Sequence, residues 1–333
     1  MDKIAAIFSC IFAVLVLSLV LVQVLSSVAY SPHINSLVAA DARVIELNFN
    51  SLMESDTNTL SSTLSVLKED AKIREIYLHQ NRTELYDHVL PLFTHLKNEY
   101  GITHWYFISK DGKTFLRAHN KEIYGDEINR FTFLRARETG NISTGLELGK
   151  TAYALRAVSP YYDDNGTLIG YMELGEEIDH FIDILAQRTN SRFSLLADKE
   201  YIDKKDWESR RSTSGLRNNW NDLQSLLLLS PAEEDSTVMK CFNESNVYEA
   251  KKGKVVFSGF ESDQKTFKCA GFQIVDAGER PSGVLLALID VSQYIKFQDN
   301  SSFAAFVFSA LCLTLALGAG YLFAHLEKGK KRK

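Results

Sequence analysis

The chain lacks the sequence features that mark several large classes of protein. Its 333 residues include only four cysteines, too few for a disulfide-built scaffold of this length, and the net charge of −5 indicates no nucleic-acid partner. It contains no Gly-x-Ser-x-Gly, His-Glu-x-x-His or paired-carboxylate motif. We therefore expect neither enzyme activity nor a bound cofactor or metal.

Charge is absent from two long stretches. Ile4–Val28 and Phe303–Phe323 are runs of 25 and 21 residues without a charged side chain. Each is long enough to cross a hydrocarbon core of about 30 Å as a helix. We therefore expect transmembrane helices at 4–28 and 303–324. A cleaved signal peptide is the alternative for the first run, but that run exceeds the roughly 7–15 apolar residues of a signal core.

The basic residues predict the orientation in the membrane. The tail 325–333 carries Lys328 and four further basic residues directly after the second run. Because positive charge is retained in the cytoplasm, both termini are expected inside the inner (cytoplasmic) membrane, with residues 30–302 outside it. A disulfide between Cys241 and Cys269 would persist there, but the sequence does not show whether the two side chains are close enough in space to form one.

Periodicity divides the outer part into helices and strands. Apolar spacing predicts a long helix over 33–78 and a second helix that opens with a capping box at Asn81–Glu84 and ends at Gly101. These helices make up an expected segment over 30–100. Strand-like runs then follow, and Lys110–Gly112 is expected to form a hairpin turn.

One motif occurs twice. "GYMELGEEIDHFI", residues 170–182, returns 113 positions later as "GVLLALIDVSQYI", residues 283–295. Each copy has the pattern of a last strand followed by an exit helix, which predicts two tandem α/β modules at 101–188 and 189–300. The alternative is that unrelated modules are simply joined by helices. The second exit helix leads directly into the second apolar run.

Three segments resemble a known family. "WYFISKDGKTFLRAHNKEIYGDEINR" (105–130), "GLELGKTAYALRAVSPYY" (145–162) and "DKKDWES" (203–209) are similar to double Cache sensor domains of the two-component sensor kinase type. The resemblance implies an α+β fold: two tandem PAS-like modules with antiparallel sheets on a long N-terminal helix, flanked by two transmembrane helices. Such domains normally precede a HAMP linker and a signalling domain, whereas about ten residues follow the second run here.

The resemblance also implies a ligand site in the first, membrane-distal module. Strand alternation places Arg117 and His119 on one face, and the forked guanidinium groups of Arg117 and Arg156 suit a ligand carboxylate. The alternative for each arginine is an internal ion pair with Glu147 or Glu173. Tyr106 has the alternative of ordinary core packing, and His119 has that of a hydrogen-bonded polar group within the core. The candidate ligand-binding residues are Tyr106, Arg117, His119, Tyr124, Asp126, Glu147, Arg156 and Glu173.

Two further residue patterns have simple structural explanations. Asp126 follows Gly125 and has the alternative role of capping the inserted helix before Gly140. Glu176, Asp179 and His180 have helical spacing, and acidic residues in a first helical turn are favoured by the helix dipole. We therefore do not interpret them as a metal site.

Together these features predict a sensor of small molecules. We expect it to signal across the membrane through a separate partner protein, as a parallel homodimer along the 33–78 helix. The alternative is a membrane-anchored binding or scaffold protein without signalling output. Neither hypothesis involves a nucleic acid.

Overall fold

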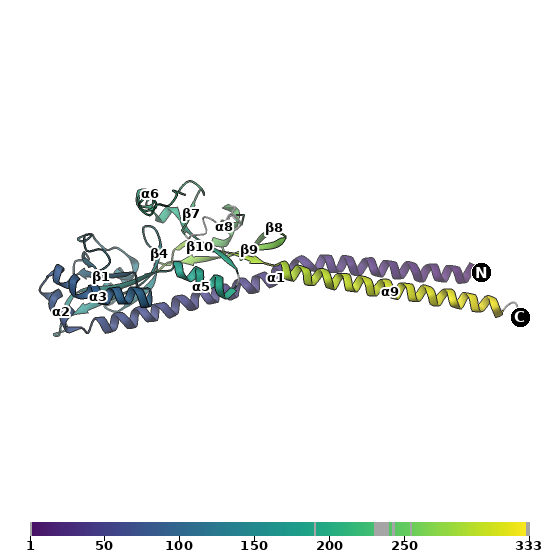
Figure 1. The fold of residues 1–333 in the computed structure, drawn as a ribbon, viewed down its shortest axis with the longest axis horizontal. Coiled ribbons are helices and arrows are strands. Elements are labelled where there is room, and N and C mark those ends of the chain that lie inside the picture. Colours follow the sequence, from purple (N-terminus) through teal and green to yellow (C-terminus); the bar gives the residue numbers. More distant parts are fainter. Residues whose placement is uncertain (1, 190, 230–239, 242–243, 254, 331–333) are drawn as a thin grey trace. The chain divides into compact units, whose positions relative to one another are not determined.

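The structure is a computed structural model that describes residues 2–189, 191–229, 240–241, 244–253 and 255–330 (Figure 1). The chain divides into two compact units. The larger comprises residues 42–258 and 269–289, and the smaller comprises residues 1–41, 259–268 and 290–333.

Three helices precede the first sheet, where the sequence predicts two. They are α1 (Asp2–Leu67), α2 (Ala71–Leu78) and α3 (Arg82–Tyr100). The prediction of one unbroken helix over 33–78 is wrong, because Asp70 accepts hydrogen bonds from the backbone N–H groups of Lys72 and Ile73 and starts a new helix. The predicted N-cap is confirmed, with the Glu84 N–H donating to Asn81 Oδ1 at 3.2 Å, and Glu84 Oε2 reaches back to accept from the side-chain amide of Asn81 at 2.8 Å.

The first sheet has five antiparallel strands in the order β2-β1-β5-β4-β3. A tight turn joins β1 to β2, as the Lys110–Gly112 segment predicts, and Gly112 has a φ of 86°. The inserted helix α4 (Phe131–Thr139) ends at Gly140, also as predicted. The strands are β1 (His104–Ser109), β2 (Thr114–Arg117), β3 (Ser143–Leu148), β4 (Tyr153–Tyr162) and β5 (Leu168–Glu177).

The second sheet repeats this strand order as β7-β6-β10-β9-β8. It follows the exit helix α5 (Asp179–Thr189) in the sequence. The segments that connect its strands contain the short helices η1 (Lys199–Tyr201), α6 (Lys204–Thr213) and α8 (Glu244–Lys251). The strands are β6 (Arg192–Asp198), β7 (Leu226–Leu228), β8 (Val256–Ser262), β9 (Lys265–Val275) and β10 (Pro281–Asp290). The shared order confirms the predicted α+β architecture of two antiparallel sheets behind a long N-terminal helix.

The glycine that begins each copy of the repeated motif has the same role in both sheets. A Cβ atom added at Gly170 would lie under 3.0 Å from Tyr77 Oη and the Ile108 carbonyl oxygen. A Cβ added at Gly283 would lie equally close to Tyr153 Oη and the Leu196 carbonyl oxygen. Each glycine therefore makes room for a tyrosine hydroxyl packed against a last strand.

The two tyrosines come from different parts of the chain. Tyr77 belongs to α2 and donates to the Ile108 carbonyl oxygen at 3.0 Å. Tyr153 begins β4 of the first sheet and donates to Ser282 Oγ, on β10 of the second, at 3.0 Å. Tyr153 thus packs against β10 much as Tyr77 packs against β5.

A disulfide joins Cys241 to Cys269, a pairing that the sequence left open. It closes a loop with a sequence separation of 28 residues. We expect the double substitution Cys241→Ser/Cys269→Ser to lower the free energy of unfolding by about 2–4 kcal/mol, because the unfolded chain regains freedom. Denaturant unfolding of the variant and of oxidised wild type measures this. A reductant that leaves the wild-type unfolding midpoint unchanged would contradict it.

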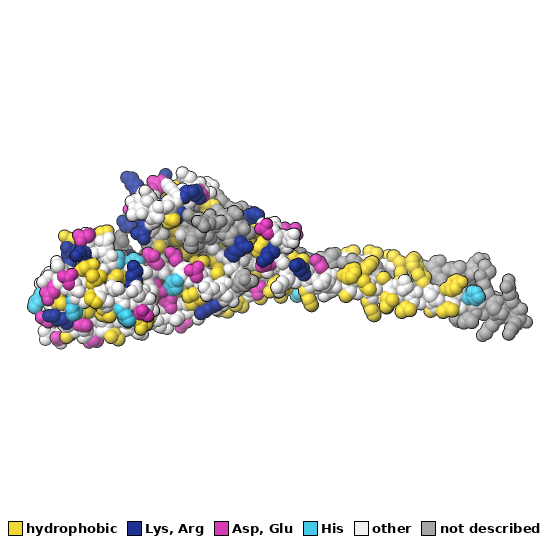
Figure 2. All heavy atoms as spheres, in the orientation of Figure 1, with side chains coloured by type: hydrophobic (Ala, Val, Ile, Leu, Met, Phe, Trp, Pro, Cys, Tyr) yellow, Lys and Arg dark blue, Asp and Glu magenta, His cyan; other side chains and the backbone are white. Residues whose placement is uncertain are grey.

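One described helix is long and apolar enough to cross a membrane. It is the Ser292–Leu322 part of α9 (Ser292–Lys330), which contains most of the predicted 303–324 span. Figure 2 shows hydrophobic side chains on the surface of α9, where Phe303, Leu311 and Leu315 are exposed. The exit helix and the span form one unbroken helix, as predicted. Residues 4–28 belong to α1, but most of their side chains lie outside the described part, so the first span stays a prediction.

Candidate functional site

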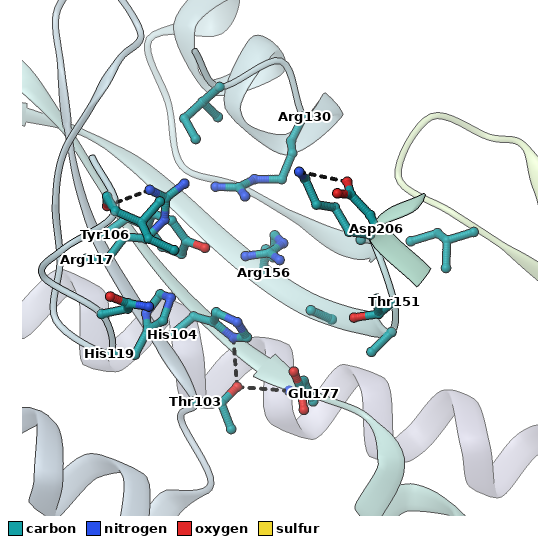
Figure 3. Close-up of a pocket in the computed structure, with 18 of the residues that line it drawn as sticks. Thr103, His104, Tyr106, Arg117, His119, Arg130, Thr151, Arg156, Glu177 and Asp206 are labelled. Atoms are coloured by element: carbon teal, nitrogen blue, oxygen red, sulfur yellow. Dashed lines mark hydrogen bonds and ion pairs between the residues drawn. The ribbon is translucent and has the colours of Figure 1, made fainter. Parts of the chain in front are cut away.

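The larger unit contains a cavity of about 970 Å³ on one face of the first sheet (Figure 3). A volume in this range suits a small organic ligand. The walls come from β1, β2, β4, the loop before α4, and residues of η1 and α6. Five of the eight candidate residues line it: Tyr106, Arg117, His119, Asp126 and Arg156.

The other three candidates lie outside the lining. Tyr124 is exposed, and the guanidinium of Arg82 lies 3.6 Å from the centre of its ring. Glu147 is buried and accepts hydrogen bonds of 2.6 Å from the backbone N–H and Oγ1 of Thr132. Its burial raises its pKa. Glu173 is fully buried and pairs with arginines of the cavity.

Two arginines share the single carboxylate of Glu173. Arg156 Nη1 lies 2.6 Å from Glu173 Oε1, and Arg130 Nη2 lies 2.6 Å from Glu173 Oε2. Burial opposes ionisation of Glu173, but Arg130 and Arg156 outweigh it and hold its pKa below the usual range. The internal ion pair considered for Arg156 is therefore present, and Arg156 also lines the cavity.

Arg130 is a cavity residue that the sequence analysis missed. It ends the family-like segment "GDEINR" and forms the N-cap position of α4, so strand alternation does not identify it. Each guanidinium has five N–H donors. The buried Nε of Arg130 and that of Arg156 have no hydrogen-bond partner among the residues that the structure describes. Figure 3 shows both guanidiniums beside the cavity.

Arg117 is held by a different carboxylate. Its Nη1 and Nη2 donate to Asp126 Oδ1 and Oδ2 at 2.8 and 2.6 Å, and Nη1 also donates to the Ile123 carbonyl oxygen at 2.7 Å. The hydrogen bonds from Arg117 lower the pKa of Asp126. The suggestion that Asp126 caps the inserted helix is wrong, because α4 begins after Arg130. The pairing of Arg117 with Glu147 or Glu173 is also wrong.

Two histidines complete the wall. The rings of His104 and His119 meet edge to face, with centroids 4.7 Å apart. Burial, assisted by Arg156 and the other arginines, lowers the pKa of His104 to about 2. Burial and Arg117 lower that of His119 to about 4. Both imidazoles are therefore neutral near pH 7, and the arginines supply the positive charge of this wall.

Residues of the second sheet's helices close one side of the cavity. Tyr201, Asp203, Asp206 and Arg210 lie in or beside η1 and α6. Lys150, in the loop between β3 and β4, pairs with Asp206 at 2.8 Å. Both side chains are substantially exposed, so this pair contributes little to stability.

The depressed pKa of His104 predicts a pH dependence of stability. The folded pKa lies below the unfolded value of 6.5, so the unfolded state binds the extra proton. The stabilising contribution is complete above pH 6.5 and is lost as the pH falls towards the folded pKa. Between pH 7 and pH 5, wild type should lose about 2 kcal/mol more unfolding free energy than His104→Asn.

Denaturant unfolding at both pH values tests this, with the variant correcting for all other titrating groups. Asparagine keeps a polar group near Thr103 Oγ1, which lies 2.8 Å from His104 Nδ1. A titration of the His104 ring signals by NMR with a midpoint near pH 6.5 would contradict the prediction.

Comparison with solved structures finds distant similarities. The periplasmic domain of Vibrio cholerae LuxQ is 13% identical over 75% of this chain and 98% of its own, with a TM-score of 0.45. The ligand-binding domain of the Campylobacter jejuni chemoreceptor Tlp3, in complex with 4-methylisoleucine, is 12% identical over 77% and 91%, with a TM-score of 0.42. A domain of a putative sensory box/GGDEF family protein from Vibrio parahaemolyticus is 17% identical over 78% and 96%, with a TM-score of 0.41.

No curated protein sequence matches this chain. The family model described as "Double sensory domain of two-component sensor kinase" matches residues 43–295, which include both sheets. This confirms the resemblance inferred from the sequence motifs. The chain therefore belongs to the family of double Cache sensor domains.

Proposed function

We propose that this chain senses a small molecule that carries an anionic group, outside the cytoplasmic membrane, and signals through a separate partner protein. The observation that carries the proposal is the sharing of one carboxylate, Glu173, by Arg130 and Arg156 beside a ligand-sized cavity. A ligand carboxylate would supply acceptors for the remaining N–H donors of these arginines. Tyr106, Arg117 and His119 form further parts of the proposed binding surface.

The proposed location has two independent supports. The disulfide between Cys241 and Cys269 suits an oxidising compartment, and the apolar stretch Ser292–Leu322 of α9 is followed by five basic residues between 328 and 333. Reporter fusions at residue 160 should be active outside, and fusions at residue 333 inside. A fusion at residue 333 that is accessible from outside would contradict this topology.

Contacts around the cavity suggest how occupancy would reach α9. The turn between β9 and β10 packs on the first sheet, where the Ala277 N–H donates to the Leu146 carbonyl oxygen at 2.7 Å. A Cβ at Gly278 would lie under 3.0 Å from the Phe131 ring. Phe131 follows Arg130 in sequence, and Leu146 precedes Glu147. A shift of α4 or β3 on binding would therefore move the turn that leads through β10 to α9.

A homodimer is the assembly that we propose for signalling. Helix α1 exposes Val44, Leu47 and Val66. Val44 and Val66 are 22 positions apart, about six turns, and so lie on one face of the helix. Cysteine substitutions across residues 40–60 should crosslink with a helical period, and a flat profile would contradict a parallel pair.

Ligand binding tests the proposal most directly. We would measure thermal shifts of the full-length chain in detergent with amino acids, organic acids, amines and purines. Compounds that carry a carboxylate should raise the melting temperature, and the matching amines should not. Arg156→Gln should abolish the shift, whereas Arg82→Gln, outside the cavity lining, should retain it. Stabilisation by amines alone would contradict an anion-binding cavity.

Signalling is tested separately from binding. In a full-length dimer with single cysteines along α9, a sensor should change its crosslinking pattern when the stabilising compound is added. A pattern that does not change, together with normal binding, would favour the alternative of an anchored binding or scaffold protein.

A further inference from the structure

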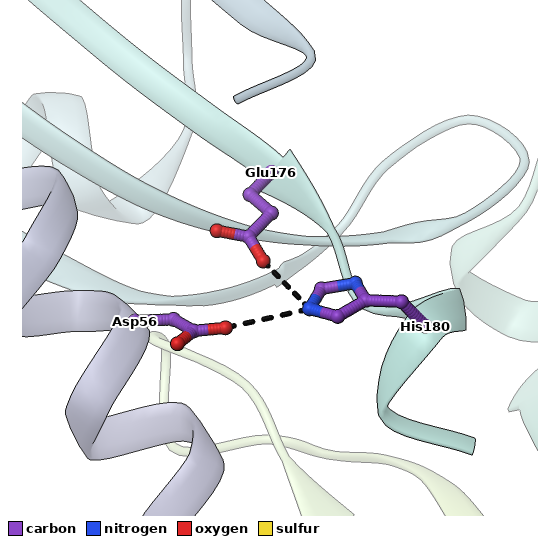
Figure 4. A group of neighbouring side chains, drawn as sticks. All are labelled: Asp56, Glu176 and His180. Carbon is purple, nitrogen blue, oxygen red and sulfur yellow. Dashed lines mark hydrogen bonds and ion pairs between the residues drawn. The ribbon is translucent and has the colours of Figure 1, made fainter. Parts of the chain in front are cut away.

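Three side chains from separate elements converge at a point outside the cavity lining (Figure 4). Asp56 comes from α1, Glu176 from the end of β5, and His180 from the first turn of α5. His180 Nε2 lies 2.8 Å from Glu176 Oε1 and 3.4 Å from Asp56 Oδ2. One atom from each residue lies within 4.8 Å of the others.

The orientation of the imidazole is set by the backbone. His180 Nδ1 lies 3.0 Å from the Glu177 carbonyl oxygen, which can only accept a hydrogen bond. Nδ1 therefore carries a proton, and Nε2 is directed at the two carboxylates. Metal-binding histidines commonly have this arrangement, with the second ring nitrogen donating to a backbone carbonyl.

In the part of the chain that the structure describes, His180 is the basic partner of both carboxylates. The Glu176 side chain is only 4% exposed, and the Asp56 side chain is 25% exposed. Among the described residues, no lysine or arginine forms an ion pair with either of them. Two carboxylates so close together, one of them buried, favour a bound cation.

Helical spacing does not account for this cluster. Glu176 lies on β5 rather than on a helix, and Asp179 is not a member. Asp56 is 124 positions from His180 and joins the group only through the fold. The explanation by helix spacing and the helix dipole therefore does not apply to Glu176 or Asp56.

We propose that Asp56, Glu176 and His180 bind a divalent transition-metal ion, with Zn²⁺ as the best fit. Ligands about 2.0–2.2 Å from a tetrahedral Zn²⁺ lie roughly 3.4 Å apart. The separation of His180 Nε2 from Asp56 Oδ2 is 3.4 Å, and that from Glu176 Oε1 is 2.8 Å, so the imidazole and Glu176 would move slightly apart when the ion binds. One imidazole and two carboxylates suit Zn²⁺ better than Mg²⁺ or Ca²⁺, which prefer oxygen ligands alone. Three protein ligands leave a fourth position for water.

The position of the site gives the ion a mechanical role. It would join α1 to the point where β5 ends and α5 begins, and β5 also carries Glu173 of the cavity. The ion would thus fix the long helix to the strand that holds the shared carboxylate. This inference does not depend on the proposed ligand, because the three metal-binding side chains lie outside the cavity lining.

Metal titration of the full-length, tag-free chain tests the inference. After chelator treatment and in detergent, we expect calorimetry with ZnCl₂ and elemental analysis to give one Zn²⁺ per chain. His180→Gln and Asp56→Asn should each weaken the affinity at least about tenfold. His88→Gln, at an exposed position of α3, should leave it unchanged. Zn²⁺ should raise the melting temperature, and Mg²⁺ at the same concentration should not.

A second measurement, on the wild-type chain, tests the inference even if the variants fold poorly without metal. Wild-type chain loaded with Co²⁺ should show the visible absorption of a low-coordinate site with one imidazole ligand. An absence of saturable binding would overturn the proposal and leave the cluster as an ion pair of protonated His180. Unchanged affinity in folded His180→Gln and Asp56→Asn would overturn it as well.

Discussion

Replacing Glu173 with alanine is expected to lower the free energy of unfolding by about 3–5 kcal/mol. The carboxylate is completely buried, and it is the shared partner of Arg130 and Arg156. Its removal leaves two guanidiniums beside a cavity without the charge that compensates them. Such a loss costs far more than the loss of an exposed ion pair, because the remaining charges are poorly solvated.

Denaturant unfolding of matched variants measures this effect. Glu75→Ala removes a carboxylate that pairs with Lys72 at 3.1 Å, but its side chain is 53% exposed, so we expect a change below about 1 kcal/mol. The triple variant Arg130→Met/Arg156→Leu/Glu173→Leu should recover much of the stability, because buried ion pairs are often replaceable by apolar groups. It should also lose binding of anionic compounds. Equal effects of Glu173→Ala and Glu75→Ala would contradict the buried arrangement.

The sequence predicts the features of this fold that depend on local chemistry. The N-cap at Asn81, the turn before Gly112 and the helix end at Gly140 all follow from residues within a few positions of one another. The 113-position repeat predicts both last strands, whose ends are offset by that same number. Family-like segments identify the module that contains the cavity, and five candidate residues line it.

Contacts between distant residues could not be predicted in this way. Strand alternation places Arg117 and Arg156 on the sheet but does not give the partner of either guanidinium. Arg117 pairs with Asp126 from the inserted loop, and Arg130 reaches Glu173 from the start of α4. The group of Asp56, Glu176 and His180 is equally hidden, because α1 is far from β5 in the sequence. Only the packing of the elements brings these charges together.

Replacing Gly283 with alanine is expected to destabilise the chain by about 3 kcal/mol or more, at the upper end for overpacked cores. The new methyl group would lie under 3.0 Å from both Tyr153 Oη and the Leu196 carbonyl oxygen. The tyrosine is fully buried, and the carbonyl belongs to a strand paired with β10, so neither can easily move. Gly170→Ala should have a similar effect, because Tyr77 and Ile108 surround that position in the same way.

Two further variants separate the overlaps at Gly283. Ser282→Ala removes only the acceptor of the Tyr153 hydroxyl and should cost about 1 kcal/mol. Tyr153→Phe added to Gly283→Ala removes the overlap with the hydroxyl but leaves the overlap with the Leu196 carbonyl, so we expect partial rescue. Full rescue would show that the backbone adjusts freely, contrary to the prediction. Tyr153 begins β4, the strand that carries Arg156, and Gly283 lies on β10, the strand that leads to α9. In Gly283→Ala protein that still folds, we therefore expect ligand binding to be kept. The ligand-dependent change in α9 crosslinking should be lost.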